Sequence, residues 1–196
     1  MDGKQSPTKA QLEALVVRAQ AGDTGAFEAL YDHFYDRIYR YVSFKAGDAT
    51  AAEDITEDVF LRMLKSIGSY KHRGHPFSSW LFRIAHNLVV DYFRKQGREK
   101  SVSLDKVLAV VGESSIDLDN YVQTKLAMRE VNAAMEDLTD LQRQVISLRF
   151  AGGLSVNETA QAVGRNENAV KALQHVGIKK LRKILMPGGA PSQQSV

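Results

Sequence analysis

The sequence predicts an all-α protein with two helical domains joined by a flexible linker, the C-terminal one a helix-turn-helix domain. Apolar residues recur at spacings of three and four along most of the chain, whereas the alternation typical of strands is weak. Residue pairs that can form capping boxes precede several of these periodic stretches. Residues 97–117 show no sustained period, which indicates the linker.

The N-terminal domain, residues 1–96, is expected to hold several helices, each marked by a local start signal. Thr8 with Gln11 is a capping box, and Asp48 is a further N-cap. Glycine and proline exclude a helix from the loop 68–77. The expected helices cover about 8–20, 24–44, 49–67 and 78–96, the last beginning at Ser78 or Ser79. The third should bury Ala52, Ile55, Val59, Phe60, Met63 and Leu64.

The C-terminal domain, residues 118–186, is expected to continue as helices and to end before a disordered tail at 187–196. Its first helix begins near residue 118 and ends near 138. Capping boxes precede the next two, formed by Thr139 with Gln142 and by Ser155 with Glu158. A long final helix begins after Asn166.

Composition and charge limit the class of protein. The 196 residues are 44% hydrophobic and 25% charged, as in ordinary globular proteins. No apolar run approaches the ~20 residues of a membrane span, no secretory signal is recognisable, and cysteine is absent. We therefore expect a cytoplasmic protein without disulfides, thiol nucleophiles or cysteine metal sites.

The charge is unevenly distributed along the chain. Residues 71–100 and 138–186 each carry a net charge of +5, while residues 101–137 between them carry −4. Two separate basic blocks suggest two contacts with a polyanion such as a nucleic acid. Two solvated basic faces explain the charge pattern equally well, so charge alone does not decide between these interpretations.

The segment 154–183 has the form of a capped helix, a glycine turn and a second helix. Ala160 is small where two helices must cross closely, Gly164 supplies the turn, and Val170 packs the second helix on the first. This spacing is typical of the DNA-binding helix-turn-helix, whose second helix lies in the major groove. The alternative is a structural helical hairpin with a basic surface. The residues expected to face the groove are Asn168, Lys171, Gln174, His175 and Lys179.

The helix expected over 78–96 has two distinct faces. One is an apolar stripe, and the other aligns Trp80, Arg83, Asn87 and Arg94. An indole can stack on an unpaired base while arginines hold the backbone. The alternative is that the tryptophan packs on an adjacent helix, as tryptophans usually do. The basic loop before this helix could pocket a flipped base and contains Tyr70, Lys71, His72, Arg73, His75 and Phe77.

The stretch EDITED, residues 53–58, is strongly acidic. It can be a solvated helix face, where the N-terminal dipole favours negative charge. It can instead be a docking face for a basic partner. A metal site formed by Glu53, Asp54, Glu57 and Asp58 is the third interpretation, although no histidine lies at ligand spacing. We expect no metal and no cofactor.

Four segments in this order resemble the extracytoplasmic-function sigma factors of bacterial RNA polymerase, the two-domain branch of the primary sigma-factor family. GDTGAFEALYDHFYDRIYRYV is similar to the early second region, and AEDITEDVFLRML resembles the core-binding helix. FSSWLFRIAHNLVVDYFRK resembles the promoter-melting segment. The span from LTDLQRQVISLRF to GIKKLRK resembles the fourth region.

The resemblance implies a role for each surface. Residues 1–96 would be region 2, and residues 118–186 region 4. The core polymerase-binding residues would be Asp54, Glu57, Asp58, Phe60 and Leu61. The minus-10 residues would be Tyr70, Lys71, His72, Arg73, Phe77, Trp80, Arg83, Asn87 and Arg94. The minus-35 residues would be Asn168, Lys171, Gln174, His175 and Lys179.

The resemblance also implies partners and an absence of catalysis. The chain would be a non-enzymatic sigma factor that binds core polymerase, recognises promoter DNA and is held by an anti-sigma protein. Its sequence departs from the family in a loop 68–77 that is about one residue longer, and in Gly177 inside the recognition helix. A stand-alone helix-turn-helix regulator and a metal-dependent enzyme using the acidic stretch are the rival interpretations.

Overall fold

The computed structural model describes residues 7–72, 74–97 and 130–186, and these residues contain helices and no strand. In chain order the elements are α1 Lys9–Gln20, α2 Thr24–Ala46, α3 Ala49–Ser66, the 3-10 turn η1 Ile67–Ser69, α4 Phe77–Lys95, α6 Asp140–Ile146, the π-helical turn η3 Ser147–Ala151, α7 Val156–Val163 and α8 Glu167–Leu185. Residues 130–136 are also helical. The all-α prediction is confirmed, while the linker 97–117 and the tail lie almost wholly outside the described residues.

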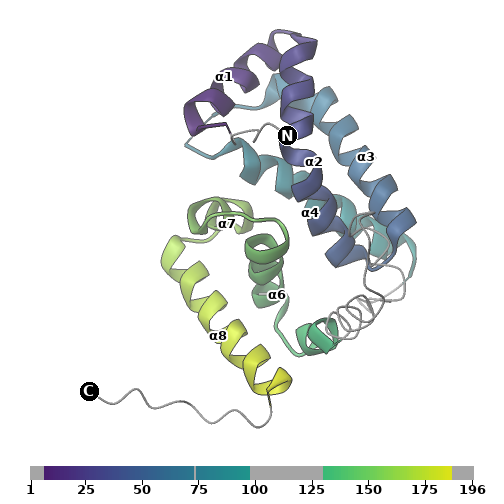
Figure 1. Ribbon diagram of the computed structural model, residues 1–196, viewed down its shortest axis with the longest axis vertical. Helices are drawn as coiled ribbons and strands as arrows, with labels where there is room; N and C mark the ends of the chain where they lie inside the picture. Colours follow the sequence, from purple (N-terminus) through teal and green to yellow (C-terminus); the bar gives the residue numbers. More distant parts are fainter. Residues whose placement is uncertain (1–6, 73, 98–129, 187–196) are drawn as a thin grey trace, which may run out of the picture.

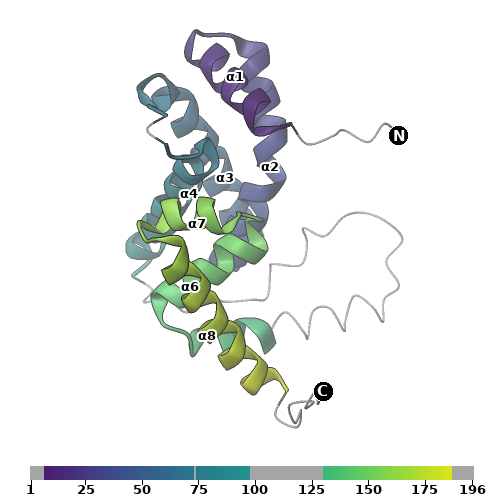
Figure 2. The ribbon, with the colours of Figure 1, turned by 90° about the vertical axis from the view of Figure 1, so that its left-hand side faces the viewer.

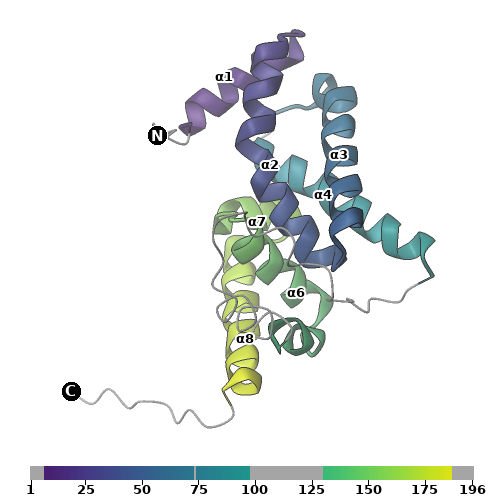
Figure 3. The same ribbon diagram turned by 45° about the vertical axis from the view of Figure 1, so that its right-hand side comes forward.

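The helices from α1 to α4 form the N-terminal unit around the long helix α2 (Figure 1). α2 packs on α1 and on α3, and α4 crosses both α2 and α3 (Figure 3). Leu30, Phe34 and Ile38, which share one side of α2, are fully buried. α1 lies at the end of the molecule opposite α8 (Figure 2).

Helix ends are set by the local signals that the sequence predicts. Thr8 and Gln11 form a capping box at 2.7 and 3.3 Å, and the Asp48 side chain accepts from the Ala51 amide. The fourth helix differs from expectation, because it begins at Phe77 with Pro76 at the N-cap and no side-chain cap. Ser78 and Ser79, which we expected at the start of this helix, donate hydrogen bonds to the C-terminal unit.

The C-terminal unit contains the predicted helix-turn-helix. Gly164 ends α7 in the left-handed conformation, with φ at 66°, and its amide donates to Ala160. Val145, Ala160 and Val170 form the small core between α6, α7 and α8. Ala160 and Val170 thus have the packing roles that their spacing predicts.

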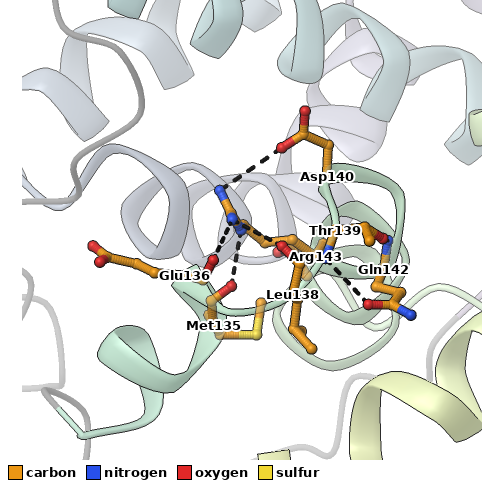
Figure 4. A network of polar contacts seen from close by, with 8 residues as sticks. Met135, Glu136, Leu138, Thr139, Asp140, Gln142 and Arg143 are labelled. Carbon is orange, nitrogen blue, oxygen red and sulfur yellow. Dashed lines mark hydrogen bonds and ion pairs between the residues drawn. The ribbon is translucent and has the colours of Figure 1, made fainter. Parts of the chain in front are cut away.

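Arg143 joins the helical residues 130–136 to α6 (Figure 4). Its guanidinium donates to the carbonyl oxygens of Met135, Glu136 and Leu138, at 3.0, 3.1 and 3.1 Å. These carbonyls lie at and just after the end of the helical residues 130–136, where backbone acceptors need partners from outside the helix; the Met135 carbonyl also accepts from the Leu138 amide at 3.1 Å. The arginine therefore caps one helix from the next and fixes the bend between them.

The two units pack directly on each other. Leu148 and Leu154 belong to the C-terminal unit, yet they are buried in the core that α1 to α4 build. Arg37 of α2 donates to the Gly152 and Gly153 carbonyls, each at 3.2 Å. The contact therefore combines apolar burial with hydrogen bonds to a turn that exposes its backbone.

Candidate nucleic-acid interface

The outer face of α3 is acidic and carries two exposed leucines. Asp54, Glu57 and Asp58 all lie on the surface, as expected. Leu61 is 51% exposed and Leu64 is 56% exposed. The prediction that Leu64 is buried is wrong, since it lies outside the stripe that packs on α2. Carboxylates around exposed leucines form a surface suited to docking a basic partner with apolar contacts.

Phe60 lies on the opposite side of α3 and is only 4% exposed. Its ring packs against Tyr31 and Tyr35 of α2, with centroids 4.6 and 6.1 Å away. Phe60 therefore packs beneath the acidic face of α3 and presents almost no surface to a partner.

The loop between η1 and α4 is held by Tyr70. The Tyr70 hydroxyl donates to the His75 carbonyl at 2.7 Å and lies 3.2 Å from His72 Nδ1. Burial raises the pKa of Tyr70, and the nearby Glu13 adds to the shift. Because Tyr70 is only 9% exposed, it shapes the loop and is not free to stack on a base in this arrangement. Lys71 and His72 remain exposed, and Arg73 lies outside the described residues.

Trp80 packs with the two aromatic residues that flank this loop. Its ring centroid lies 5.3 Å from that of Tyr70 and 5.2 Å from that of Phe77. Phe77 is buried, whereas Trp80 is partly buried. Trp80 therefore packs on other side chains, although these ring partners come from the loop and from α4 itself, and its indole remains partly accessible beside the loop.

The polar residues expected along α4 share its outer surface, and two of them have partners. Arg83 donates to the Gln161 carbonyl of α7 at 2.6 Å. Arg94 pairs with Asp91 at 3.1 Å, and Asn87 is exposed. The face predicted for single-stranded DNA thus exists, but part of it is engaged by the C-terminal unit.

The outer face of α8 presents most of its predicted residues to solvent. Asn168, Lys171, His175 and Lys179 are all exposed. Lys180 instead donates to the Asp137 carbonyl and helps hold α8 against the chain before α6. The exposed set lies on the N-terminal two thirds of α8, where a recognition helix meets base edges.

Gln174 is half-buried, and its side-chain oxygen accepts from Arg149 Nε at 3.0 Å. Arg149 also donates to the Leu154 carbonyl. Because Arg149 holds the side-chain oxygen of Gln174, the NH₂ group of this amide is the one left to face outward. Sequence reasoning missed Arg149, because it lies in the π-helical turn η3, 25 residues away from Gln174.

Within the described ranges, no three His, Asp or Glu side chains gather closely enough to hold a metal ion. His86 of α4 is partly buried, with Nδ1 3.3 Å from the Tyr41 hydroxyl of α2, and burial together with Lys45 lowers its pKa. None of the helices in the described part of the chain is long and apolar enough to cross a membrane.

Two family models match the chain in the order that the architecture implies. Residues 30–99 match Sigma-70 region 2, and residues 134–183 match Sigma-70, region 4. The SigX factor of Bacillus subtilis is 34% identical over 160 residues, which cover 80% of this chain and 82% of that protein. The chain belongs to the extracytoplasmic-function sigma factors. It is thus a promoter-specific RNA polymerase sigma factor.

A further relative agrees with this assignment, and two solved structures share the fold. The BldN factor of Streptomyces coelicolor is 38% identical over 176 residues, and the match spans 90% of this sigma factor and 66% of BldN. The structure of CnrH with the cytosolic domain of CnrY has a TM-score of 0.67 at 21% identity, covering 90% of this chain and 97% of that one. RpoE of Bartonella quintana with the anti-sigma factor NepR gives 0.60 at 20% identity, with coverages of 81% and 96%. These structures support the fold.

Proposed function

We propose that this sigma factor contacts its targets through three separate faces. The acidic face of α3 docks on core polymerase, the loop 70–77 and the outer face of α4 hold the opened minus-10 strand, and the outer face of α8 binds the minus-35 duplex. The observation that carries the proposal is that the basic faces of α4 and α8 belong to two different units. A protein that only binds duplex DNA would need only the basic face of α8.

The face of α3 suits a protein partner better than DNA. Its carboxylates would repel phosphates, whereas they favour a basic surface and speed encounter with it. Leu61 and Leu64 add apolar area that becomes buried on docking.

Capture of unpaired bases provides the energy for opening. Unstacking a base costs a few kcal/mol, and stacking on an aromatic ring returns about 1–3 kcal/mol per base. Trp80, which packs with Tyr70 and Phe77 and is partly accessible, is the side chain on which such stacking can occur. Exposed Asn87 lies on the same helix and can read a base edge.

The contact between the units bears on when these faces act. Because Nη2 of Arg83 is bonded to α7, use of its whole guanidinium on DNA requires the C-terminal unit to move away. We therefore infer that this arrangement precedes promoter binding. An anti-sigma protein is the partner that the family relationship suggests, since the similar RpoE structure includes one. The chain would work without catalysis in the cytoplasm, where RNA polymerase acts.

Run-off transcription with purified core polymerase on genomic fragments tests this function. We expect discrete transcripts only when core and this chain are both present. A gel shift on the resulting promoter, with and without core, separates the alternatives. Tight duplex binding without core, together with no transcripts, would favour the stand-alone helix-turn-helix regulator.

A further inference from the structure

Gln20, at the end of α1, reaches across to the loop that precedes α4. Its Nε2 donates to the Ile67 carbonyl at 2.9 Å and to the Tyr70 carbonyl at 2.7 Å. Both acceptors are carbonyl oxygens, so the group that faces them must be the amide NH₂, which has two protons to give. The contact is partly buried and joins positions 47 and 50 residues apart in sequence.

These two carbonyls bracket the 3-10 turn η1. The Ile67 carbonyl already accepts from the Tyr70 amide at 3.0 Å, and Gln20 provides it with a second donor. The same side chain then fixes the Tyr70 peptide from its other end. One amide group thus sets both the end of the turn and the direction in which the chain leaves it.

The effect extends into the loop through the Tyr70 side chain. With its peptide fixed, Tyr70 directs its hydroxyl to the His75 carbonyl, which closes the loop on itself. A second contact from the same helix reaches the loop, because His72 Nε2 lies 3.5 Å from Glu13 Oε1. α1 therefore contacts the loop at its start and near its middle.

We propose that Gln20 is a positioning residue for base capture, which sets the conformation of the loop 70–77 without touching DNA. This inference rests on the proposed role of that loop in holding an unpaired minus-10 base. Gln20 lies before residue 30, where the match to Sigma-70 region 2 begins. Base selectivity would thus depend on a helix outside the matched segment.

Two substitutions remove the donors in different ways. Gln20→Glu keeps the shape but turns an oxygen toward two carbonyl oxygens, and Gln20→Met removes the donors without adding charge. Gln20→Lys restores donors to both carbonyls and should rescue. The matched control is Gln11→Glu on the same helix, because Gln11 uses only its side-chain oxygen as an acceptor and glutamate keeps that capping bond.

The test uses the full chain bound to core polymerase. Its probes are single-stranded oligonucleotides covering the melted segment of a promoter found by run-off transcription, each with one base replaced. Affinity for each replacement gives the base selectivity at every position. We expect Gln20→Glu and Gln20→Met to lose about tenfold in selectivity at one position, a loss consistent with two missing hydrogen bonds. Core affinity should stay unchanged, and Gln20→Lys and Gln11→Glu should resemble the unmodified protein.

The outcomes separate this inference from the proposed function. Full selectivity in the Met and Glu variants, beside a selective unmodified protein, would overturn the role of Gln20 alone. An unmodified holoenzyme without base selectivity at any position would overturn the capture role of the loop and this inference with it. Equal losses at all positions together with weaker core binding would mean that Gln20 acts on folding only, which also contradicts the proposal.

Discussion

The carboxylate of Glu158 accepts a hydrogen bond from the Ser78 hydroxyl, and so joins the start of α7 to the start of α4. The same carboxylate accepts from the Ser155 amide at 2.7 Å, which completes the capping box of α7. Ser79 adds a bond from its hydroxyl to the Glu158 carbonyl at 2.8 Å. One residue thus caps a helix of the helix-turn-helix and holds it against the N-terminal unit.

The environment of Glu158 keeps it ionised. Burial by itself would raise the pKa of this carboxyl, but the hydrogen bonds from Ser78 and Ser155 and the charge of Arg37 outweigh it. The pKa therefore lies below the ordinary 4.5. Because the pKa of Glu158 is lower in the folded state, its ionisation stabilises the protein at pH values above the pKa of the unfolded state. This stabilisation is lost as the pH falls through the pKa of the folded state.

Glu158→Gln should destabilise the protein near neutral pH by about 1–2 kcal/mol, because the amide retains only one of the two acceptor oxygens. The penalty should shrink as the pH falls below 4.5, where the native carboxyl also becomes protonated. Urea denaturation of both proteins across this range measures the difference. Glu28→Gln, at an exposed position of α2, is the control. A penalty that is constant with pH would contradict the assigned role.

Gly152→Ala tests the close packing of the turn after η3, both against Phe82 of α4 and within the C-terminal unit. A Cβ at this position would lie 2.6 Å from Phe82 Cε1 and 2.9 Å from the Leu148 carbonyl oxygen. The backbone there suits alanine, with φ at −80°, so the effect is steric. We expect a loss of about 1–3 kcal/mol in the free energy of unfolding. Gly68→Ala, where a Cβ meets nothing within 4 Å, should be close to neutral. Equal effects at the two glycines would mean that the turn at Gly152 is not packed this closely in solution.

Local signals allowed most of the fold to be predicted, because caps and turns depend on residues only a few positions apart. Thr8, Asp48 and Ser155 all cap helices as expected. α4 begins one residue before Ser78, and the side chains of Ser78 and Ser79 bond to α7, about 80 residues away. No periodicity in the sequence reveals such a tertiary contact.

Gly177 in α8 has a packing reason that the sequence did not reveal. A Cβ there would lie 2.6 Å from Ile146 Cδ1, so its absence lets α8 approach α6 closely. Alanine is favoured over glycine within a helix by about 1 kcal/mol, and the clash opposes this gain. In an Ile146→Val background the clashing methyl is gone. We therefore expect Gly177→Ala to raise the free energy of unfolding of the Ile146→Val protein by about 1 kcal/mol. In the unmodified chain the same substitution should raise it by less. Urea denaturation of the four proteins measures the coupling, and purely additive effects would exclude the contact.

Leu61→Ser and Leu64→Ser should each weaken binding to core polymerase by about tenfold, because each exposed leucine would be buried on docking. Folding should change little, since both side chains already face solvent. Fluorescence titration of labelled chain with core polymerase measures the affinity. Val17→Ser is the matched control, because Val17 is 65% exposed on α1, away from α3. Equal losses in all three variants would remove α3 as the docking helix.

Helical spacing in the sequence located the polar surface residues of the candidate site, but it did not predict how the aromatic residues pack. Lys171 and Asn87 are exposed as helical spacing predicts. Tyr70 and Phe77 look like binding residues in a basic loop, yet they are buried beneath Trp80. Spacing gives the side of a helix, but it does not show how a loop of ten residues folds over its own aromatic rings.

Lys171→Ala tests the placement of α8 on the minus-35 element. Its side chain is exposed near the start of α8, where a lysine can donate to guanine or contact a phosphate. If it contacts a phosphate, the affinity of holoenzyme for promoter DNA should fall uniformly across sequences and the salt dependence should fall by about one unit of slope. If it reads a base, affinity should fall by about 1–3 kcal/mol with relaxed preference at a single minus-35 position. Lys9→Ala, at an exposed position of α1 outside the three proposed faces, is the control for charge alone. A footprint over the minus-35 element that matches that of the unmodified protein in both extent and salt dependence would rule out this placement.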